Sequence, residues 1–380
     1  MASGAATGVD SGSDSGLEAP LPDDFAGRLV RWQRLHGRHG LPWQGTRDPY
    51  RVWLSEIMLQ QTQVATVLDY YPRFLARFPD VAALAQAPLD DVLALWAGLG
   101  YYSRARNLHG CARRVMADWG GVFPARAADL VTLPGIGVST AAAIAAFCHG
   151  ERISILDGNV QRVLARHRGL DEDFSRAAPR RELQRLADAL VPHASEMPVY
   201  TQALMDLGAT RCTPRQAACD VCPVRRDCIA LAQGRVHELP RKARATVQKV
   251  WAHALLLHAH CDCAGLWHVA LVQRPATGVW SGLWTPPLLD EAQQAQRRAH
   301  APPIRAHEAF LHVLTHRRWF LTPWLCATRG GDLPDAVALG LDGDQAAAMR
   351  WWTLDQAAGL ALPAPVRARW LGWMEELTAA

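Results

Sequence analysis

The hydrophobic pattern changes near Pro240, and this change separates two parts of the chain that belong to different fold classes. Over residues 25–232 apolar side chains recur at helical spacing, and breakers such as Pro72 set short connections between the helices. Strand-like runs follow at 247–260, 267–273, 304–315 and 319–327. The pattern predicts a multidomain protein, in which an all-α domain precedes an α+β domain over residues 250–380 that a helix at 364–377 closes.

The charge is unevenly spread along the chain. Residues 1–24 hold five acids, no base and almost no large apolar side chain, so we expect a disordered acidic tail. Residues 25–240 hold 26 Lys and Arg against 20 Asp and Glu, and residues 233–249 are expected to form a basic linker. This positive charge suits a phosphate backbone, although a solvated surface accounts for it nearly as well.

A Pro-Gly turn lies between two predicted helices. Pro134 ends the first helix, while Gly135 and Gly137 allow positive φ and expose backbone amides. Ser139 is expected to cap the second helix, residues 140–147, whose positive end favours an anion. The turn therefore predicts a helical hairpin that grips a phosphate group, with an ordinary helix-turn-helix corner as the alternative.

No apolar run reaches the roughly 18 residues of a membrane helix, and the first 20 residues lack a signal peptide's basic start. We therefore expect a cytoplasmic protein.

Four of the nine cysteines are clustered. Cysteines in that compartment favour metal binding over disulfides. The spacing C-x6-C-x2-C-x5-C predicts a metal site, for which zinc and an iron–sulfur cluster stay open; its ligands are Cys212, Cys219, Cys222 and Cys228.

The hairpin and the cysteine loop together resemble the endonuclease III-like helix-hairpin-helix DNA glycosylases, in which such a loop holds one 4Fe-4S cluster. Within that superfamily, three motifs resemble the adenine DNA glycosylases of the MutY family: WLSEIMLQQTQV at 53–64, WAGLGYYSRARNLH at 96–109 and LDGNVQR at 156–162. The resemblance covers about residues 28–380. It implies a monomeric base excision repair enzyme, associated with the nucleoid, that flips and excises adenine mispaired with 8-oxoguanine or guanine in double-stranded DNA.

Two carboxylates match the family's catalytic residues. Glu56 lies within an apolar helix, where burial would raise its pKa, and it matches the general acid that protonates adenine. Asp157 matches the aspartate that stabilises the sugar cation, and it is also expected to cap the helix starting near Asn159.

Ser139 stands where strand-cutting relatives carry a lysine that forms a Schiff base with the sugar. The resemblance therefore implies a monofunctional hydrolase with no or very weak lyase activity. A pyrimidine-lesion glycosylase and lyase is the nearest alternative, which Ser139 opposes. A catalytically silent DNA-binding protein is another, which the presence of both Glu56 and Asp157 opposes.

Five further residues match the family's contacts with DNA and adenine. Gln60, Gln61 and Tyr101 match side chains that enter the duplex at the flipped site and replace lost stacking. Trp43 and Gln202 match the adenine pocket, the first by stacking on the base and the second by hydrogen bonding to its edge.

The C-terminal part resembles the family's Nudix-like domain, which reads 8-oxoguanine. It lacks the glutamate-rich run that binds magnesium in Nudix hydrolases, so we expect recognition without nucleotide hydrolysis. The family's Phe-Ser-His reading loop aligns with Leu314, Thr315 and His316. Thr315 keeps the hydroxyl that bonds the altered purine edge, whereas Leu314 replaces an aromatic ring and loses its stacking.

Overall fold

The computed structural model describes residues 24–241, 247–300 and 305–379. Residues 1–23 of the expected acidic tail and residues 242–246 of the expected basic linker lie outside this range. Asp24 instead caps the first helix, because its Oδ1 accepts a 2.8 Å hydrogen bond from the Gly27 amide. None of the helices in the described ranges has the length and apolar character needed to cross a membrane.

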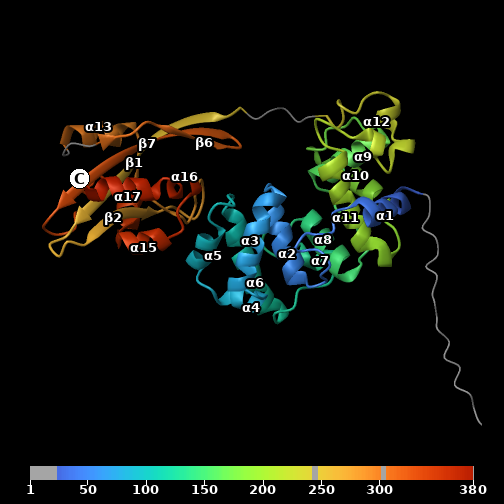
Figure 1. The fold of residues 1–380 in the computed structure, drawn as a ribbon, viewed down its shortest axis with the longest axis horizontal. Helices are drawn as coiled ribbons and strands as arrows, with labels where there is room; N and C mark the ends of the chain where they lie inside the picture. Colours follow the sequence, from blue (N-terminus) through green and yellow to red (C-terminus); the bar gives the residue numbers. More distant parts are fainter. Residues whose placement is uncertain (1–23, 242–246, 301–304, 380) are drawn as a thin grey trace, which may run out of the picture.

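Within the described chain, helices are the regular elements before residue 249, as predicted. Their bounds are α1 (Phe25–His36), α2 (Pro49–Leu59), α3 (Val64–Arg77), α4 (Val81–Gln86), α5 (Leu89–Trp96), α6 (Ser103–Trp119), α7 (Ala127–Leu130), α8 (Val138–His149), α9 (Gly158–Arg168), α10 (Ala177–Ala189), α11 (Met197–Asp206) and α12 (Ile229–Ala232). Figure 1 shows α2, α3 and α6 in the middle of the molecule and α9, α10 and α12 at one end.

Pro72 lies inside α3, so its assignment as a helix breaker is wrong. A proline in this position removes one backbone hydrogen bond from the helix. The buried face of α3, formed by Val67, Tyr71 and Phe74, packs into the core and holds the helix together.

The glycine hairpin joins α7 to α8, but its capping differs from the prediction. Gly135 has φ +76°, the left-handed conformation that glycine tolerates. Gly137 has φ −84° and ψ 170°, and it is the N-cap of α8. Ser139 lies in the first turn of that helix and accepts a 3.2 Å hydrogen bond from the Leu156 amide through its Oγ. The expected positive φ at Gly137 and the expected cap at Ser139 are therefore wrong, because α8 begins two residues earlier than predicted.

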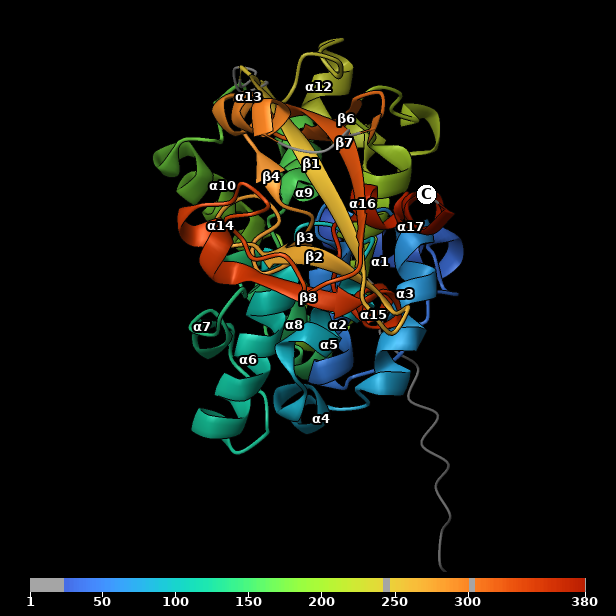
Figure 2. The same cartoon turned by 90° about the vertical axis from the view of Figure 1, so that its left-hand side faces the viewer.

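The C-terminal part folds around a mixed sheet. Its strands are β1 (Lys249–Cys261), β2 (Trp267–Gln273), β3 (Trp284–Thr285), β4 (Leu288–Leu289), β5 (Arg305–Ala306), β6 (Phe310–Leu314), β7 (Arg317–Arg329) and β8 (Met349–Thr353). The central order is β3-β2-β1-β7-β5, with β4 paired to β1, β6 to β7 and β8 to β2. The long strands β1 and β7 pair in parallel, from Lys249 opposite Arg317 to Cys261 opposite Arg329. Figure 2 shows these two strands side by side.

Several C-terminal boundaries differ from the prediction. The helix expected at 364–377 is two helices, α16 (Ala364–Arg367) and α17 (Trp370–Ala379). The single run expected at 304–315 contains the separate strands β5 and β6. The prediction also missed the strands β3, β4 and β8 and three helices, α13 (Glu291–His300), α14 (Gly343–Ala348) and α15 (Leu354–Gly359). The helices are short or rich in polar residues, so their periodicity is weak.

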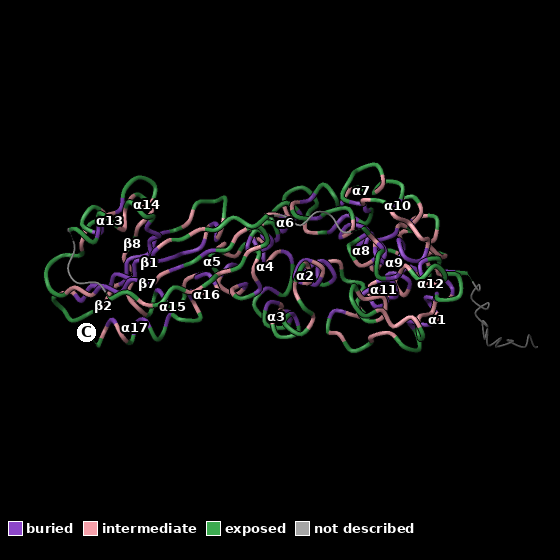
Figure 3. The backbone as a smooth tube through the Cα atoms, turned by 90° about the horizontal axis from the view of Figure 1, so that it is seen from above, coloured by how far each residue is buried: buried purple, intermediate pink, exposed green. Residues whose placement is uncertain are grey.

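The two parts share a continuous hydrophobic cluster. Leu93 of α5 and Tyr102 at the start of α6 belong to it, together with Trp280 and Leu362 of the C-terminal part. Buried segments accordingly run through both the sheet and the helices of the elongated molecule (Figure 3). The predicted fold class, a helical domain followed by an α+β domain, is confirmed.

Candidate active site

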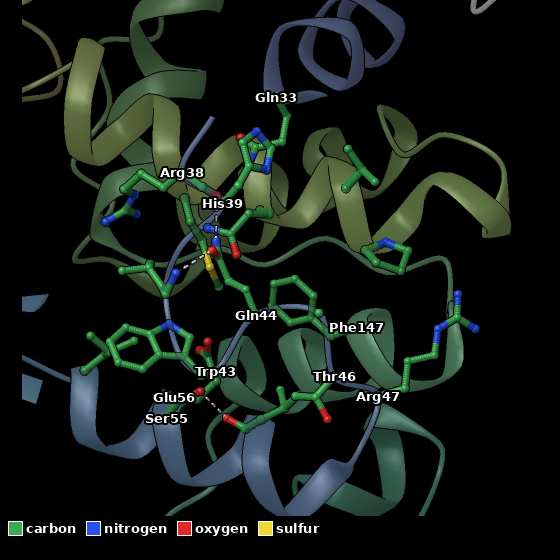
Figure 4. Close-up of a pocket in the computed structure, with 18 of the residues that line it drawn as sticks. Gln33, Arg38, His39, Trp43, Gln44, Thr46, Arg47, Ser55, Glu56 and Phe147 are labelled. Carbon is green, nitrogen blue, oxygen red and sulfur yellow. Dashed lines mark hydrogen bonds between the residues drawn. The ribbon is translucent and has the colours of Figure 1, made fainter. Parts of the chain in front are cut away.

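A cavity of about 550 Å³ lies in the helical domain, lined by residues of α2, α8, α11 and the loop after α1. Trp43, Glu56 and Gln202 all lie on its wall. Figure 4 shows Glu56 beside Ser55 on α2, with Trp43 and Phe147 around the same hollow. The volume is within the range of about 300–1,000 Å³ that is common for small-molecule pockets. The cavity is therefore large enough for a ligand the size of one nucleobase.

Glu56 is presented to the cavity by a well-capped helix. Asp48 caps α2 by accepting a 2.9 Å hydrogen bond from the Tyr50 amide, and Pro49 occupies the first turn. Trp53, one turn before Glu56 on the same helix, is fully buried. Burial, and after it the negative charge of Asp157, together raise the pKa of Glu56 from 4.5 to about 7. About half of the Glu56 carboxyl groups therefore keep their proton at pH 7.

Asp157 is the N-cap of α9, as predicted. Its Oδ1 accepts a 2.8 Å hydrogen bond from the Val160 amide, while the residue itself stays exposed to solvent. The adjacent Leu156 amide is bonded to Ser139, so the hairpin and the start of α9 are tied together. The fold thus brings Ser139 and Asp157 close together, and it places Asp157 near enough to raise the pKa of Glu56.

A buried carboxylate fixes the orientation of Gln202. The Nε2 of Gln202 donates a 2.9 Å hydrogen bond to Oδ1 of Asp206, a side chain with no exposed area. Arg38 also bonds to Asp206, through its backbone amide at 2.8 Å and its Nε at 2.7 Å. One N–H of the Gln202 amide is used in this bond, so the amide oxygen can accept from a base and the second N–H can donate to it.

Gln61 and Tyr101 both have backbone conformations that are rare for residues with side chains. Their φ angles are +54° and +48°, and such positions cluster at functional sites. Tyr101 is 48% exposed whereas the neighbouring Tyr102 is 7% exposed. Tyr101 therefore lies at the surface, and Tyr102 lies in the core. Gln60 donates a 3.4 Å hydrogen bond to Thr140 of α8.

Buried Arg104 holds both of these segments. Its Nη1 donates to the carbonyl oxygens of Ile57 and Met58, at 2.8 and 2.9 Å, where α2 ends before Gln61. Its Nη2 donates to the Leu99 carbonyl at 3.0 Å, just before Tyr101. The Arg104 guanidinium also lies 5.6 Å from the centre of the Tyr101 ring. One side chain therefore stabilises the two positive-φ turns.

The turn between β6 and β7 approaches Tyr101 from the other domain. This turn consists of Thr315 and His316, both exposed, and it follows Leu314, which packs against the core cluster. Tyr101 Oη lies 3.5 Å from Oγ1 of Thr315. The strand hairpin reaches toward the helical part in Figure 1. The fold thus places the predicted reading loop beside Tyr101, one of the three residues predicted to enter the duplex.

The four clustered cysteines line one small cavity of about 30 Å³. Cys212 accepts a 3.4 Å hydrogen bond at its Sγ from Nη1 of Arg166. Cys212 and Cys222 pack against the core of the helical domain, while Cys219 and Cys228 pack against Val236 and Leu239. Among the described residues, no group of three or more His, Cys, Asp or Glu side chains has the arrangement of a single-ion site.

Sequence reasoning missed Arg104, Asp206 and Arg38. Each is a charged residue whose importance depends on which carbonyl or amide groups it meets in the fold. Arg104 lies within the 96–109 motif that also contains Tyr101, and this position is the nearest sequence signal of its importance. Asp206, four residues after Gln202, has the spacing of a neighbour on one helix face.

Models of two families match the chain. The HhH-GPD superfamily of base excision DNA repair proteins matches residues 54–190, and the NUDIX domain matches residues 263–371. A solved structure of a thermostable thymine-DNA glycosylase is similar to the helical part, with a TM-score of 0.50 and 27% identity, covering 55% of this chain and 95% of that one.

Relatives match over most of the chain. It is 30% identical to the adenine DNA glycosylase of Buchnera aphidicola subsp. Baizongia pistaciae (strain Bp), across 90% of this chain and 94% of that protein. It is 35% identical to the adenine DNA glycosylase of Mus musculus, across 94% of this chain and 75% of that protein. The resemblance expected from the motifs is confirmed. The chain therefore belongs to the adenine DNA glycosylases, hydrolases of base excision DNA repair.

Proposed function

We propose that this glycosylase removes adenine mispaired with 8-oxoguanine or guanine in double-stranded DNA, acting as a monomer. The observation that carries the proposal is Glu56, with its pKa raised to about 7, in a cavity that it shares with Trp43 and Gln202. Adenine must leave the base stack to reach this cavity. Trp43 would stack on the flipped base, and the Gln202 oxygen would accept a hydrogen bond from its amino group.

Glu56 and Asp157 would divide the chemistry between them. Glu56 donates its proton to the adenine ring, and the N-glycosidic bond breaks with its electron pair leaving on the base. A cation then develops on the sugar, where the negative charge of Asp157 stabilises it. Water adds to the sugar carbon and loses a proton to the Glu56 carboxylate, which restores the acid. The products are adenine and an abasic site.

Ser139 supports release of the base without strand cleavage. A hydroxyl cannot form the Schiff base that an amine forms with the sugar, and the Oγ of Ser139 is already bonded to the Leu156 amide. The reaction therefore stops at the abasic site, and the enzyme is monofunctional.

The DNA would be held by the hairpin and distorted by the two positive-φ turns. Gly135 and Gly137 are exposed and bring bare backbone to the surface of the hairpin, where amides bind phosphate. Gln60, Gln61 and Tyr101 would occupy the space that the extruded adenine leaves, supported by Arg104.

The Thr315–His316 turn would read the opposite base. The Thr315 hydroxyl can donate or accept a hydrogen bond at the altered edge of 8-oxoguanine. Its position 3.5 Å from Tyr101 puts it close to the flipped site. Leu314 packs into the core and supplies no exposed ring, so recognition would depend on the hydroxyl and on His316.

We infer that Cys212, Cys219, Cys222 and Cys228 hold one 4Fe-4S cluster. All four cysteines line one common cavity, and Nη1 of Arg166 donates a hydrogen bond to the sulfur of Cys212, which suits a thiolate-bound cluster. The cluster would cross-link the loop that packs on both the helical core and the Val236–Leu239 segment.

A strand-cleavage assay tests the proposed function. The protein is incubated with an 8-oxoguanine:A duplex labelled on the adenine strand, and breaks are compared with and without alkali. We expect breaks only after alkali treatment. The Glu56→Gln variant should produce no abasic sites, a loss of at least about 100-fold that is typical of removing a general acid. Breaks without alkali, or a covalent complex trapped by borohydride, would contradict the assignment of Ser139.

A further inference from the structure

The loop that joins β2 to β3 is strained where it meets the helical domain. Trp280 has φ +57°, a conformation rarely adopted by a bulky side chain, and is only 7% exposed. Gly278 and Gly282 on either side also have positive φ angles, +92° and +73°. A conformation of this kind persists when surrounding contacts hold it in place.

Arg106 of α6 supplies one set of those contacts. Its Nη1 donates to the carbonyl oxygen of Ser281, and its Nη2 donates to the hydroxyl of the same residue. Ser281 is 4% exposed, so the accepting side of this double contact is buried. A Cβ built on Gly282 would lie 3.7 Å from Nη1 of Arg106 and 3.9 Å from Leu93, so the loop backbone rests directly on α5 and α6. Two hydrogen bonds from one planar guanidinium fix both the orientation of the loop and its distance from α6.

Trp280 connects the same loop to the strand hairpin that carries Thr315. Its ring centre lies 4.6 Å from that of Trp319 on β7 and 5.3 Å from that of His312 on β6. Trp319 is 1% exposed, and the Trp319 Nε1 donates a 3.0 Å hydrogen bond to His253 on β1. A shift of Trp280 is therefore transmitted to the rigid base of the hairpin.

Helix α6 also positions the turn that contains Tyr101. Arg104, two residues before Arg106, holds this turn from inside the helical domain. Two nearby arginines of α6 therefore stabilise different segments. Arg104 stabilises the turn that contains Tyr101, and Arg106 stabilises the strained loop of the other domain. The two paths meet again where Tyr101 approaches Thr315.

We propose that Arg106, Ser281 and Trp280 form an interdomain latch that determines the preference for the opposite base. The latch sets the position of the Thr315–His316 turn relative to Tyr101 and the flipped site. Arg106 and Trp280 are positioning residues that touch neither adenine nor the opposite base. This proposal rests on the proposed function, in which Thr315 reads 8-oxoguanine.

The test compares single-turnover excision of adenine from 8-oxoguanine:A and G:A duplexes. Arg106→Met keeps the length and apolar stem of the side chain but removes both donations to Ser281. We expect the ratio of the two rate constants to fall by about tenfold, the effect of losing a charged hydrogen bond of moderate strength. The rate constant for G:A should stay within about twofold of the original value. General destabilisation would lower both rate constants together.

Matched variants sharpen the comparison. Arg113→Met removes an exposed arginine from the same helix and should leave the ratio unchanged. Arg106→Lys retains one donor and should restore part of the ratio. Ser281→Ala removes only the hydroxyl partner, so it gives a milder variant should Arg106→Met fail to fold. Combined with Arg106→Met, Ser281→Ala should add nothing further, because both changes break the same contact.

The outcomes separate the latch from the proposed function. Thr315→Val is measured in parallel and should lower the 8-oxoguanine preference directly. An unchanged ratio in Arg106→Met beside a lowered ratio in Thr315→Val would overturn the latch alone. A protein without preference for 8-oxoguanine:A would overturn both the assigned reading turn and the latch.

Discussion

Two features of the surroundings of Glu56 raise its pKa. Desolvation on α2 and the nearby charge of Asp157 both favour the protonated carboxyl, and together they raise its pKa to about 7. Asp157, in contrast, is exposed and accepts a hydrogen bond from a helix N-terminus. Two carboxylates in unlike surroundings can therefore take unlike roles, one as an acid and one as an anion.

The pH dependence of excision should report this difference. Glu56 is mostly protonated below pH 7 and ionised above it, so the single-turnover rate constant should fall as the pH rises through about 7. The loss should approach tenfold for each further pH unit. A profile measured on the 8-oxoguanine:A duplex between pH 5.5 and about 9 would check this. A rate constant that stayed level up to pH 9 would contradict Glu56 as the general acid.

The sequence predicts part of this site and misses the rest for a physical reason. The apolar neighbours of Glu56 predict its burial, and the position of Asp157 before a helix predicts its cap, because both follow from local pattern. Arg104 and Asp206 are buried charges whose bonding partners come from other segments of the chain. Only packing decides that such residues lose contact with water.

The hairpin between α7 and α8 contains two glycines with different requirements. Gly135 has positive φ, and a Cβ there would lie 2.6 Å from the Cβ of Asn107 on α6. Gly137 has an ordinary extended backbone with open space around it. The sequence alone does not indicate which of the two positions requires glycine. The difference arises from how closely α6 approaches the turn.

Alanine substitutions should separate the two glycines. Gly135→Ala is expected to reduce the free energy of unfolding by about 1–2 kcal/mol from the left-handed backbone alone, and the clash with Asn107 adds to it. Gly137→Ala should change it by no more than about 0.5 kcal/mol. Urea unfolding of both variants provides the measurement. Equal losses would contradict the geometry described for the hairpin.

The two turns that present Gln61 and Tyr101 were predicted as contact sites but not as strained segments. Neither residue is a glycine, so nothing in the sequence indicates positive φ. The strain becomes visible only with Arg104, which bonds to the carbonyls that precede each turn. Local propensity fails here because the hydrogen bonds of one buried side chain override it.

The molecule as a whole joins three units: the helical core, the cysteine loop that closes it, and the sheet domain that leans on α5 and α6. The order of these units follows from periodicity and cysteine spacing in the sequence. Their docking does not, because it depends on single contacts such as Arg106 with Ser281 and Tyr102 with the Leu362 carbonyl.

Loss of the cluster should weaken the helical domain. Cys222→Ser removes one of the four ligands, and the purified variant should lose the broad visible absorption of thiolate-bound iron. If the loop contributes only about 2 kcal/mol, the melting temperature should fall by about 4–8 °C. Cys111→Ser, at a buried cysteine outside the loop, serves as the control and should keep the colour. A colourless protein that contains zinc would contradict the iron assignment.

The parallel pairing of β1 with β7 has a consequence for how the chain is made. β1 ends at Cys261, but its partner strand begins only at Arg317. During synthesis β1 leaves the ribosome well before β7 is made. Until then, the long edge of β1 that pairs with β7 has no partner strand. Long-range parallel pairing folds slowly and leaves such edges open to aggregation. The sheet domain therefore completes its fold late in translation, when the helical domain is already available as a surface on which to assemble.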